Sequence, residues 1–401
     1  MPAETGAPGA MVRALLPRYR KVLGVAVIED AEISWSRVVG APADRMFEAG
    51  SISKPVTALA ALLLVAHGRA DLDEDVNSQL TSWQLPGPCR VSLRQLLGHT
   101  AGTGVPFFPG YPQDAPLPTL VQVLDGAAPA ITPTVRASAG RHGAFRYSGG
   151  GYAIIQQLIS DVTGLPFADA ARSLVIEPLE MTRSTFEQPL PPQLASAAAR
   201  PDWHSYPEAG AAGLWTTPAD LARYVCALQA AQAGRTSAIP AAVAAQLLAP
   251  HARLPVRGEW NVLPLLGVRP PDACGLGMFL HGDDRFSHIG GAASFFSVLT
   301  ASAADGTGAI VMTASNPAPF PFRLLRAISA EHGWTGFRQP ARKRLAGLPG
   351  LRRLTHRSAS ASESGRPRAA ADPAHCGADD GEPLLRQLPV AAVGSDHIQA
   401  L

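Results

Sequence analysis

The chain has 401 residues, of which 46% are hydrophobic and 16% charged, and its formal net charge is +2. This is long enough to bury a large core, and the near-neutral balance excludes nucleic acid as an expected main partner. The four cysteines lie far apart with no C-x-x-C pair, so we expect no zinc site, no disulfide scaffold and no cofactor.

The N-terminal segment favours a location in the cytoplasm. Residues 1–28 lack a continuous apolar segment after a basic start, so we expect no signal peptide. No apolar run approaches the roughly 18 residues that span a membrane. A secreted form stays open if translation begins further upstream.

The first predicted elements are a hairpin and a helix. "VLGVAVIED" and "EISWSRVVG" are β-rich runs joined by a short polar link, which predicts antiparallel strands within residues 22–40. A helix is predicted to begin near Ser51, with Pro55 in its first turn and Gly68 after its end.

Helical segments broken by proline and glycine follow over about residues 71–250. Strand character returns only late, in "CGLGMFLHG", "AASFFSVLTA" and "GAIVMTASN", before a closing helix in "PFRLLRAISAEHG". Strands at both ends and helices between them predict an α+β fold. We expect one antiparallel sheet built from N- and C-terminal strands, flanked by helices, with a mostly helical inserted subdomain.

The composition predicts one domain over residues 20–338 and a low-complexity, disordered tail over residues 339–401. Residues 338–368 hold nine basic residues and one acidic residue, Glu363. We interpret this stretch as a solvated tail, with anionic lipid or RNA as the alternative target.

Ser51 and Lys54 form an S-x-x-K motif at the head of the apolar helix. Three residues apart, the two side chains share one helix face. A serine hydroxyl becomes a strong nucleophile when a base takes its proton, and burial in an apolar setting gives a lysine that capacity. Alone the motif is weak, because an N-cap serine beside a surface lysine has the same spacing.

Five further segments, taken with "FEAGSISKPVTA" around the S-x-x-K motif, make the sequence resemble a known family. The chain is similar, over roughly residues 22–335, to serine hydrolases of the class C β-lactamase and penicillin-binding protein type, which include esterases, D-aminopeptidases and transesterases. The resemblance implies their β-lactamase/transpeptidase-like fold. The further segments are "LRQLLGHTAG", "FRYSGGGYAIIQQLI", "PLEMTRSTF", "AAGLWTTPADLARY" and "SHIGGAASFF".

The resemblance implies roles for individual residues. Ser51 would be the acylated nucleophile, Lys54 its partner, and Tyr147 a general base coupled to Lys54. The backbone N–H groups of Ser51 and Gly291 would form the oxyanion hole. Substrate-binding positions would be Ser148, Gly149, His288 and Gly290. His99 is interpreted as a structural brace and Asp220 as a helix-start residue.

Two departures from the family pattern affect the expected substrate. Gly149 stands where many members have asparagine, and His288 stands where lactamases have lysine. The glycine removes a side-chain amide, and a partly charged imidazole holds a substrate carboxylate less firmly than an ammonium does. Both departures disfavour β-lactamase activity and leave acyl transfer intact.

The sequence therefore predicts a metal-free serine hydrolase that acts on a small ester or amide and is most similar to esterases. Three alternatives remain open: a weak β-lactamase or D-aminopeptidase/carboxypeptidase, a non-catalytic relative that serves as a binding or assembly module, and a protein whose basic tail carries the function. The acyl acceptor and the oligomeric state are not predicted.

Overall fold

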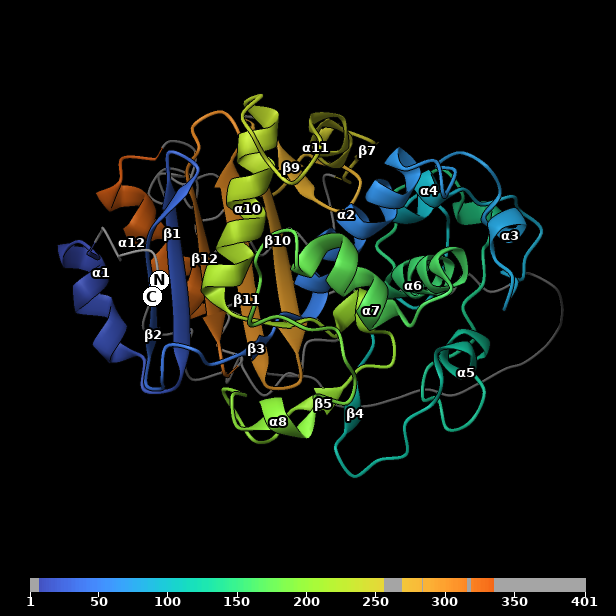
Figure 1. Ribbon diagram of the computed structural model, residues 1–401, viewed down its shortest axis with the longest axis horizontal. Helices are drawn as coiled ribbons and strands as arrows, with labels where there is room; N and C mark the ends of the chain where they lie inside the picture. The colour runs from blue at the N-terminus through green and yellow to red at the C-terminus, as the bar shows by residue number, and fades with distance from the viewer. Residues whose placement is uncertain (1–6, 256–268, 283, 316–318, 335–401) are drawn as a thin grey trace, which may run out of the picture.

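An eight-stranded antiparallel sheet forms the centre of the molecule. The computed structural model describes residues 7–255, 269–282, 284–315 and 319–334. Strands from the two ends of the chain lie side by side in the order β2-β1-β12-β11-β10-β9-β8-β7, which confirms the predicted α+β fold (Figure 1). The strands are β1 (Leu23–Glu29), β2 (Glu32–Val39), β7 (Ala252–Arg253), β8 (Ala273–Cys274), β9 (Phe279–His281), β10 (Arg285–Ala292), β11 (Phe295–Ser302) and β12 (Gly308–Thr313).

Helices cover both faces of this sheet. Val25 and Val27 of β1 pack in one apolar cluster with α1 (Ala10–Leu15) and α12 (Pro319–Glu331). Ala26 and Ile28 point the other way into the larger cluster, beside α10 (Pro218–Gln232). Because both faces are covered, β1 has no polar side chain from Leu23 to Ile28. Helix α1 precedes residue 20, where the sequence placed the start of the domain, and packs into this core.

The remaining helices lie mainly on the α10 side of the sheet (Figure 1). They are α2 (Ser53–Ala66), α3 (Val76–Gln79), α4 (Leu93–Leu97), α5 (Leu120–Asp125), α6 (Gly149–Thr163), α7 (Phe167–Ala171), α8 (Pro192–Ala195), α9 (Ala209–Ala212) and α11 (Ala241–Leu248). Single turns of 3-10 helix occur at η1 (Leu16–Arg18), η2 (Gly50–Ile52) and η3 (Ala139–Arg141), and a π-helical turn occurs at η4 (Arg172–Ile176).

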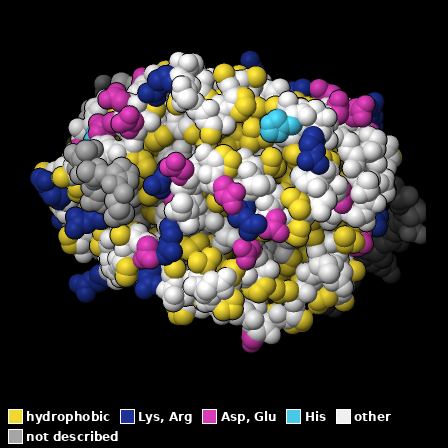
Figure 2. All heavy atoms as spheres, in the orientation of Figure 1, with side chains coloured by type: hydrophobic (Ala, Val, Ile, Leu, Met, Phe, Trp, Pro, Cys, Tyr) yellow, Lys and Arg dark blue, Asp and Glu magenta, His cyan; other side chains and the backbone are white. Residues whose placement is uncertain are grey.

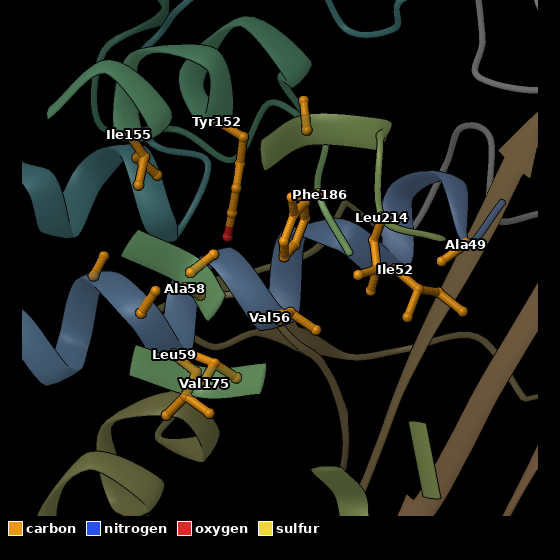
Figure 3. Packing of buried hydrophobic residues seen from close by; sticks show 14 of the residues in the cluster. Ala49, Ile52, Val56, Ala58, Leu59, Tyr152, Ile155, Val175, Phe186 and Leu214 are labelled. Carbon is orange, nitrogen blue, oxygen red and sulfur yellow. The ribbon is translucent and has the colours of Figure 1, made fainter. Parts of the chain in front are cut away.

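Helix α2 is the core of this helical layer. Every residue from Ser53 to Leu64 is buried, so the helix is enclosed on all sides. Figure 3 shows Ala58 of α2 near Tyr152 of α6. It also shows Val175, which belongs to η4, on another side of α2. A helix that is enclosed all round needs the continuous apolar run that the sequence has here.

Several strands differ from those expected. Strand β10 was not predicted, because histidine, serine and two glycines give "RFSHIGGA" little intrinsic strand preference. Pairing with β11 along its whole length imposes the extended conformation. Within the mostly helical middle, short strand pairs also occur, which join β3 (Phe47–Glu48) to β6 (Trp215–Thr216) and β4 (Tyr111–Pro112) to β5 (His204–Ser205).

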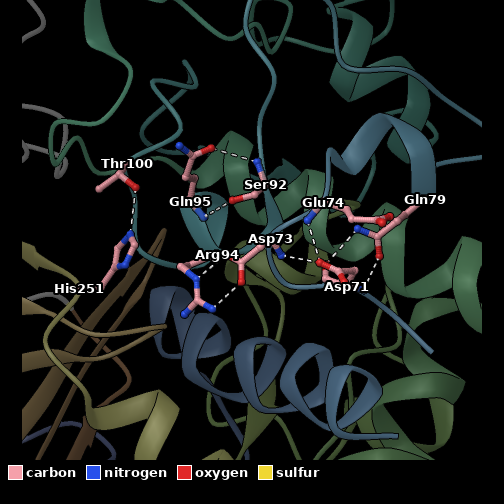
Figure 4. Close-up of polar contacts among 9 residues, drawn as sticks. All are labelled: Asp71, Asp73, Glu74, Gln79, Ser92, Arg94, Gln95, Thr100 and His251. Atoms are coloured by element: carbon pink, nitrogen blue, oxygen red, sulfur yellow. Dashed lines mark hydrogen bonds and ion pairs between the residues drawn. The ribbon is translucent and has the colours of Figure 1, made fainter. Parts of the chain in front are cut away.

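Polar contacts hold the segment between α2 and α4 (Figure 4). Ser92 and Gln95 form a capping box at the start of α4, each side chain bonding to the other's backbone N–H. The guanidinium of Arg94 donates to both carboxylate oxygens of Asp73, at 2.6 and 2.8 Å. Thr100 reaches the Nε2 atom of His251 at 3.0 Å, which ties the loop after α4 to the segment before β7.

Figure 2 shows both basic and acidic side chains exposed on one face of the molecule. Within the described ranges, no helix combines the length and apolar character that crossing a membrane requires. The predicted tail over residues 339–401 lies outside the described residues.

Strand β10 approaches the turn before α2 more closely than a side chain would allow. A Cβ atom on Gly290 would lie 1.8 Å from the carbonyl oxygen of Ala49. A Cβ atom on Gly50, whose φ is +54°, would lie 2.5 Å from the carbonyl oxygen of Gly291. Glycine at both positions therefore permits backbone-to-backbone contact between the sheet and this turn.

We expect Gly290→Ala to destabilise the fold, because a methyl group must force two backbones apart. An overpacked site of this kind costs about 1–3 kcal/mol, which corresponds to a fall of several degrees in Tm. Thermal unfolding followed by circular dichroism measures it. The matched control is Gly140→Ala, since a Cβ atom there meets nothing within 4 Å. Equal Tm values for the two variants would show that this contact is not constraining.

Candidate active site

Ser51 lies in the short turn η2, directly before α2. The sequence predicted helix near this residue, and the structure places Ser51 in the tight turn that leads into it. The hydroxyl of Ser53 donates to the Gly50 carbonyl at 2.6 Å and accepts the N–H of Leu214 at 2.9 Å. These bonds attach the turn to the segment before β6, so the position of Ser51 is fixed from two sides.

Lys54 donates to the Ser51 hydroxyl oxygen across 3.0 Å. Its amine also donates to the carbonyl of Ala211 at 2.8 Å, and the side chain is only 2% exposed. Burial lowers the pKa of Lys54 from 10.5 to about 7, and the negative charge of Glu208 opposes that fall. An amine with this pKa is partly a free base at neutral pH and can accept the proton of Ser51.

The ring of Tyr147 lies beside this pair. The Lys54 Nζ atom is 5.0 Å from the centre of the ring. His99 packs against the same ring, with 4.5 Å between ring centroids. His99 also accepts the N–H of Arg146 on its carbonyl oxygen at 2.7 Å and the N–H of Ser148 on its Nδ1 atom at 3.2 Å. The brace that the sequence analysis assigned to His99 is therefore seen directly.

The hydroxyl of Ser148 forms hydrogen bonds within the protein. It caps α6 by accepting the N–H of Gly151 at 2.9 Å, accepts from Thr103 at 2.9 Å and donates to the Gly104 carbonyl at 2.7 Å. The side chain is 1% exposed. Its one proton and its lone pairs therefore have protein partners, and a substrate contact by Ser148 stays a prediction.

His288 is buried and uncharged. It is 2% exposed, stacks on Phe279 at 5.0 Å, and its Nδ1 atom donates to the Ile289 carbonyl at 2.9 Å. Burial, together with the charge of Lys54, lowers the pKa of His288 to about 3. A neutral imidazole holds a substrate carboxylate less firmly than an ammonium does, and Phe279 and the surrounding core keep the ring out of water.

The predicted glycines have different surroundings. Gly149 and Gly291 line a cavity, whereas Gly290 is packed against Ala49 and serves the fold. A Cβ atom on Gly149 would lie 3.0 Å from the Pro106 carbonyl oxygen and 3.1 Å from the Phe108 ring. The loop that carries Phe108 thus fills the space in which a side chain at position 149 would begin.

The cavity has a volume of about 370 Å³ and opens above Ser51. Its wall is mainly apolar and aromatic, and Lys54 is the one lysine or arginine among its described lining residues. Residues 106–109, Tyr206 and Ala212 were not predicted to line a site, since nothing in their local sequence marks them. The lining residues are Ser51, Lys54, Pro106, Phe107, Phe108, Pro109, Gly149, His204, Tyr206, Ala212, Gly291, Ala292 and Ala293.

Residues of the motif "AAGLWTTPADLARY" stabilise the fold and also contact Lys54 in the candidate site. Asp220 lies in the first turn of α10, as expected, and its carboxylate accepts the N–H of Arg183 and the hydroxyl of Ser184, both at 2.8 Å. The carbonyl of Ala211, which holds Lys54, belongs to the same motif. No described cluster of three histidine, cysteine, aspartate or glutamate side chains has a geometry that could hold a metal ion.

Comparisons with known proteins agree with this geometry. The structure is similar to that of a beta-lactamase/D-alanine carboxypeptidase from Yersinia pestis, with TM-score 0.63 and 17% identity over 80% of this chain and 98% of that one. It is similar to a D-amino acid amidase from Ochrobactrum anthropi SV3 (TM-score 0.58, 19% identity, 80% and 100% coverage). It is also similar to a class C beta lactamase from Rhodobacter sphaeroides, with TM-score 0.58 and 17% identity over 80% of this chain and 97% of that one.

At these identities the similarity to solved structures shows the fold alone. No curated protein sequence matches the chain. A family model described as Beta-lactamase matches residues 7–333, which is most of the chain. The protein therefore belongs to the beta-lactamase family, whose members are serine hydrolases.

Proposed function

We propose that the protein hydrolyses small uncharged esters through an acyl-enzyme on Ser51. The observation that carries the proposal is the 3.0 Å contact between the Ser51 hydroxyl and the buried Lys54 amine. A hydroxyl beside a base that is partly unprotonated at neutral pH is an activated nucleophile.

In the proposed acylation step, the Ser51 oxygen attacks the ester carbonyl carbon while its proton moves to the Lys54 amine. The N–H groups of Ser51 and Gly291 stabilise the oxyanion, and each such donor is typically worth about 3 kcal/mol. Both residues line the cavity, and the turn of Ser51 lies against β10 at Gly290 and Gly291. Collapse of the tetrahedral intermediate expels the alcohol, which takes the proton back from Lys54.

Deacylation repeats the step with water as the nucleophile. Tyr147 is proposed to share the proton with Lys54, because its ring lies 5.0 Å from that amine. Water attacks the acyl carbon, its proton passes to the Lys54–Tyr147 pair, and Ser51 leaves as the free hydroxyl. The carboxylic acid product then departs from the cavity.

The cavity wall supports an uncharged substrate. Its lining is largely phenylalanine, proline and alanine, which favours apolar acyl groups. Lys54 is the one lysine or arginine that a substrate carboxylate meets among the described lining residues. The uncharged state of His288 removes the other expected anchor. The competing substrates are D-amino acid amides and D-alanine peptides. Two enzymes of similar fold are named D-amino acid amidase and D-alanine carboxypeptidase.

We expect Ser51→Ala to abolish labelling by a fluorophosphonate probe and to lower kcat/KM for p-nitrophenyl butyrate by at least about 10³-fold. Peptide mapping by mass spectrometry locates the label. The control is Ser196→Ala, which replaces an exposed serine and keeps full activity. Label on another residue, or full turnover by Ser51→Ala, would contradict the proposal.

We expect p-nitrophenyl butyrate to be a better substrate than the cephalosporin nitrocefin. A β-lactam needs a partner for its side-chain amide and a cation for its carboxylate, and Gly149 and neutral His288 supply neither. Losing both contacts costs about 2–4 kcal/mol, or about 30- to 1000-fold in specificity. The kcat/KM values are compared on one preparation, with D-alanine p-nitroanilide as the peptidase arm. A preference for nitrocefin supports the lactamase alternative, and a preference for the anilide supports the D-aminopeptidase.

A further inference from the structure

Glu208 is a buried carboxylate that neither the sequence analysis nor the proposed steps use. It is the residue directly before α9 and is 0% exposed. Although the carboxylate is near its own backbone N–H, neither oxygen forms a hydrogen bond within the described part of the chain. A buried polar group without a partner destabilises a fold, so its presence needs a physical reason.

The turn that carries Glu208 is fixed by α2. The carbonyl of Ala211, three residues after Glu208, accepts from the Lys54 amine at 2.8 Å. One residue earlier, the carbonyl of Gly210 accepts from the hydroxyl of Thr57 at 2.9 Å. Lys54 and Thr57 lie one turn apart on α2, so this helix holds the turn at two successive carbonyls.

The same turn is fixed on its other side by α6. The side-chain amide of Gln156 donates to the Pro207 carbonyl at 2.9 Å and accepts the N–H of Gly210 at 2.8 Å. These two bonds bracket Glu208. The backbone of Glu208 is therefore held in one position relative to Lys54.

The charged and titratable groups around the pair leave Lys54 and Glu208 as mutual counter-charges. Tyr111 and Tyr206 are the titratable neighbours on which the Glu208 charge acts, and both are phenols. His99 and His288 face Lys54, and burial lowers the pKa of both imidazoles, so both are neutral near pH 7.

We propose that Glu208 is a positioning residue of the active site, whose buried carboxylate sets the pH at which Lys54 can take the proton of Ser51. The proposal rests on the proposed function. Burial raises the pKa of Glu208, and the Lys54 charge opposes that rise. The two groups therefore titrate as a coupled pair close to neutral pH.

The sign of the effect follows from the charges. The carboxylate of Glu208 stabilises the ammonium form of Lys54 and so raises the pKa of the amine. Glutamine at position 208 has the same shape without the charge. In Glu208→Gln the Lys54 pKa falls further, and the free base persists to lower pH.

The first experiment measures the pH dependence of fluorophosphonate labelling and of kcat/KM for p-nitrophenyl butyrate. We expect the acid limb of both profiles to lie near pH 7 in the natural protein and about one pH unit lower in Glu208→Gln. Glu208→Asp keeps the charge, so its limb is expected to stay near that of the natural protein.

The matched control is Glu48→Gln. Glu48 is also buried, at 2% exposure, has one carboxylate oxygen without a partner, and has a pKa raised by burial. Its other electrostatic neighbour is Asp202 and not Lys54. We expect Glu48→Gln to leave the acid limb in place. An acid limb at the same pH in Glu208→Gln and in Glu48→Gln would overturn the role of Glu208.

A second experiment needs no activity. In a double-mutant cycle of Glu208→Gln with Lys54→Met, we expect Glu208→Gln to raise Tm more in the Lys54→Met background, where the carboxylate has lost its counter-charge. The effect of Glu48→Gln should be the same in both backgrounds. Additive effects of Glu208→Gln and Lys54→Met would overturn the inference.

The outcomes separate this inference from the proposed function. Absence of label on Ser51 in the natural protein would refute the nucleophile, while the double-mutant cycle still decides whether Glu208 and Lys54 interact. Label on Ser51 with an unshifted acid limb in Glu208→Gln would refute Glu208 alone. A folded Glu208→Gln that is unreactive at every pH would also refute a positioning role, because it would place Glu208 in the reaction itself.

Discussion

Burial of the Lys54 amine is the constraint on which the site depends. An exposed lysine near pH 7 is an ammonium and accepts no proton. The fall in its pKa from 10.5 to about 7 corresponds to roughly 5 kcal/mol of lost preference for the charged form, at about 1.36 kcal/mol per pH unit. The apolar run of α2 produces that environment, and the carbonyl of Ala211 and the hydroxyl of Ser51 accept from the amine within it. The same helix therefore forms the core of the helical layer and places a buried amine beside the candidate nucleophile.

A second constraint brings the sheet to this helix. Gly290 and Gly50 let β10 meet the turn of Ser51 backbone to backbone, so two segments far apart in the sequence form one edge of the cavity. A larger residue at either position would separate them. The activation proposed for Lys54 and the oxyanion stabilisation proposed for the N–H of Gly291 thus depend on different elements that a pair of glycines lets meet.

The elements that could be predicted from the sequence are those whose environment is encoded locally. Helix α2 and strands β1, β11 and β12 are continuous apolar runs, and an element enclosed on all sides shows that pattern in its own residues. Strand β10 could not be predicted in this way, because its extended form comes from pairing with β11. The Ser51–Lys54 contact was predictable from a three-residue spacing within one segment.

The features of the site that the sequence could not show share a physical cause, which is a partner distant in sequence. The hydroxyl of Ser148 is occupied by Thr103 and Gly104, and the charge of His288 is removed by burial against Phe279. Neither effect is visible in "YSG" or "HIG". Glu208 was missed for the same reason, since "YPEAG" gives no indication that its turn is held by Lys54 and Gln156.

These buried charges also bear on the alternative that the chain is a non-catalytic relative. Replacing a buried ion pair by apolar residues of similar volume is often neutral or stabilising, so a binding module gains nothing in stability from an enclosed amine or from a carboxylate without a hydrogen-bond partner. In this fold the amine lies 3.0 Å from a serine hydroxyl at the cavity wall, and the carboxylate belongs to the turn that holds the amine. A buried amine that weakens the core yet contacts this hydroxyl is what proton transfer from Ser51 requires, and this favours an enzyme over a module that only binds.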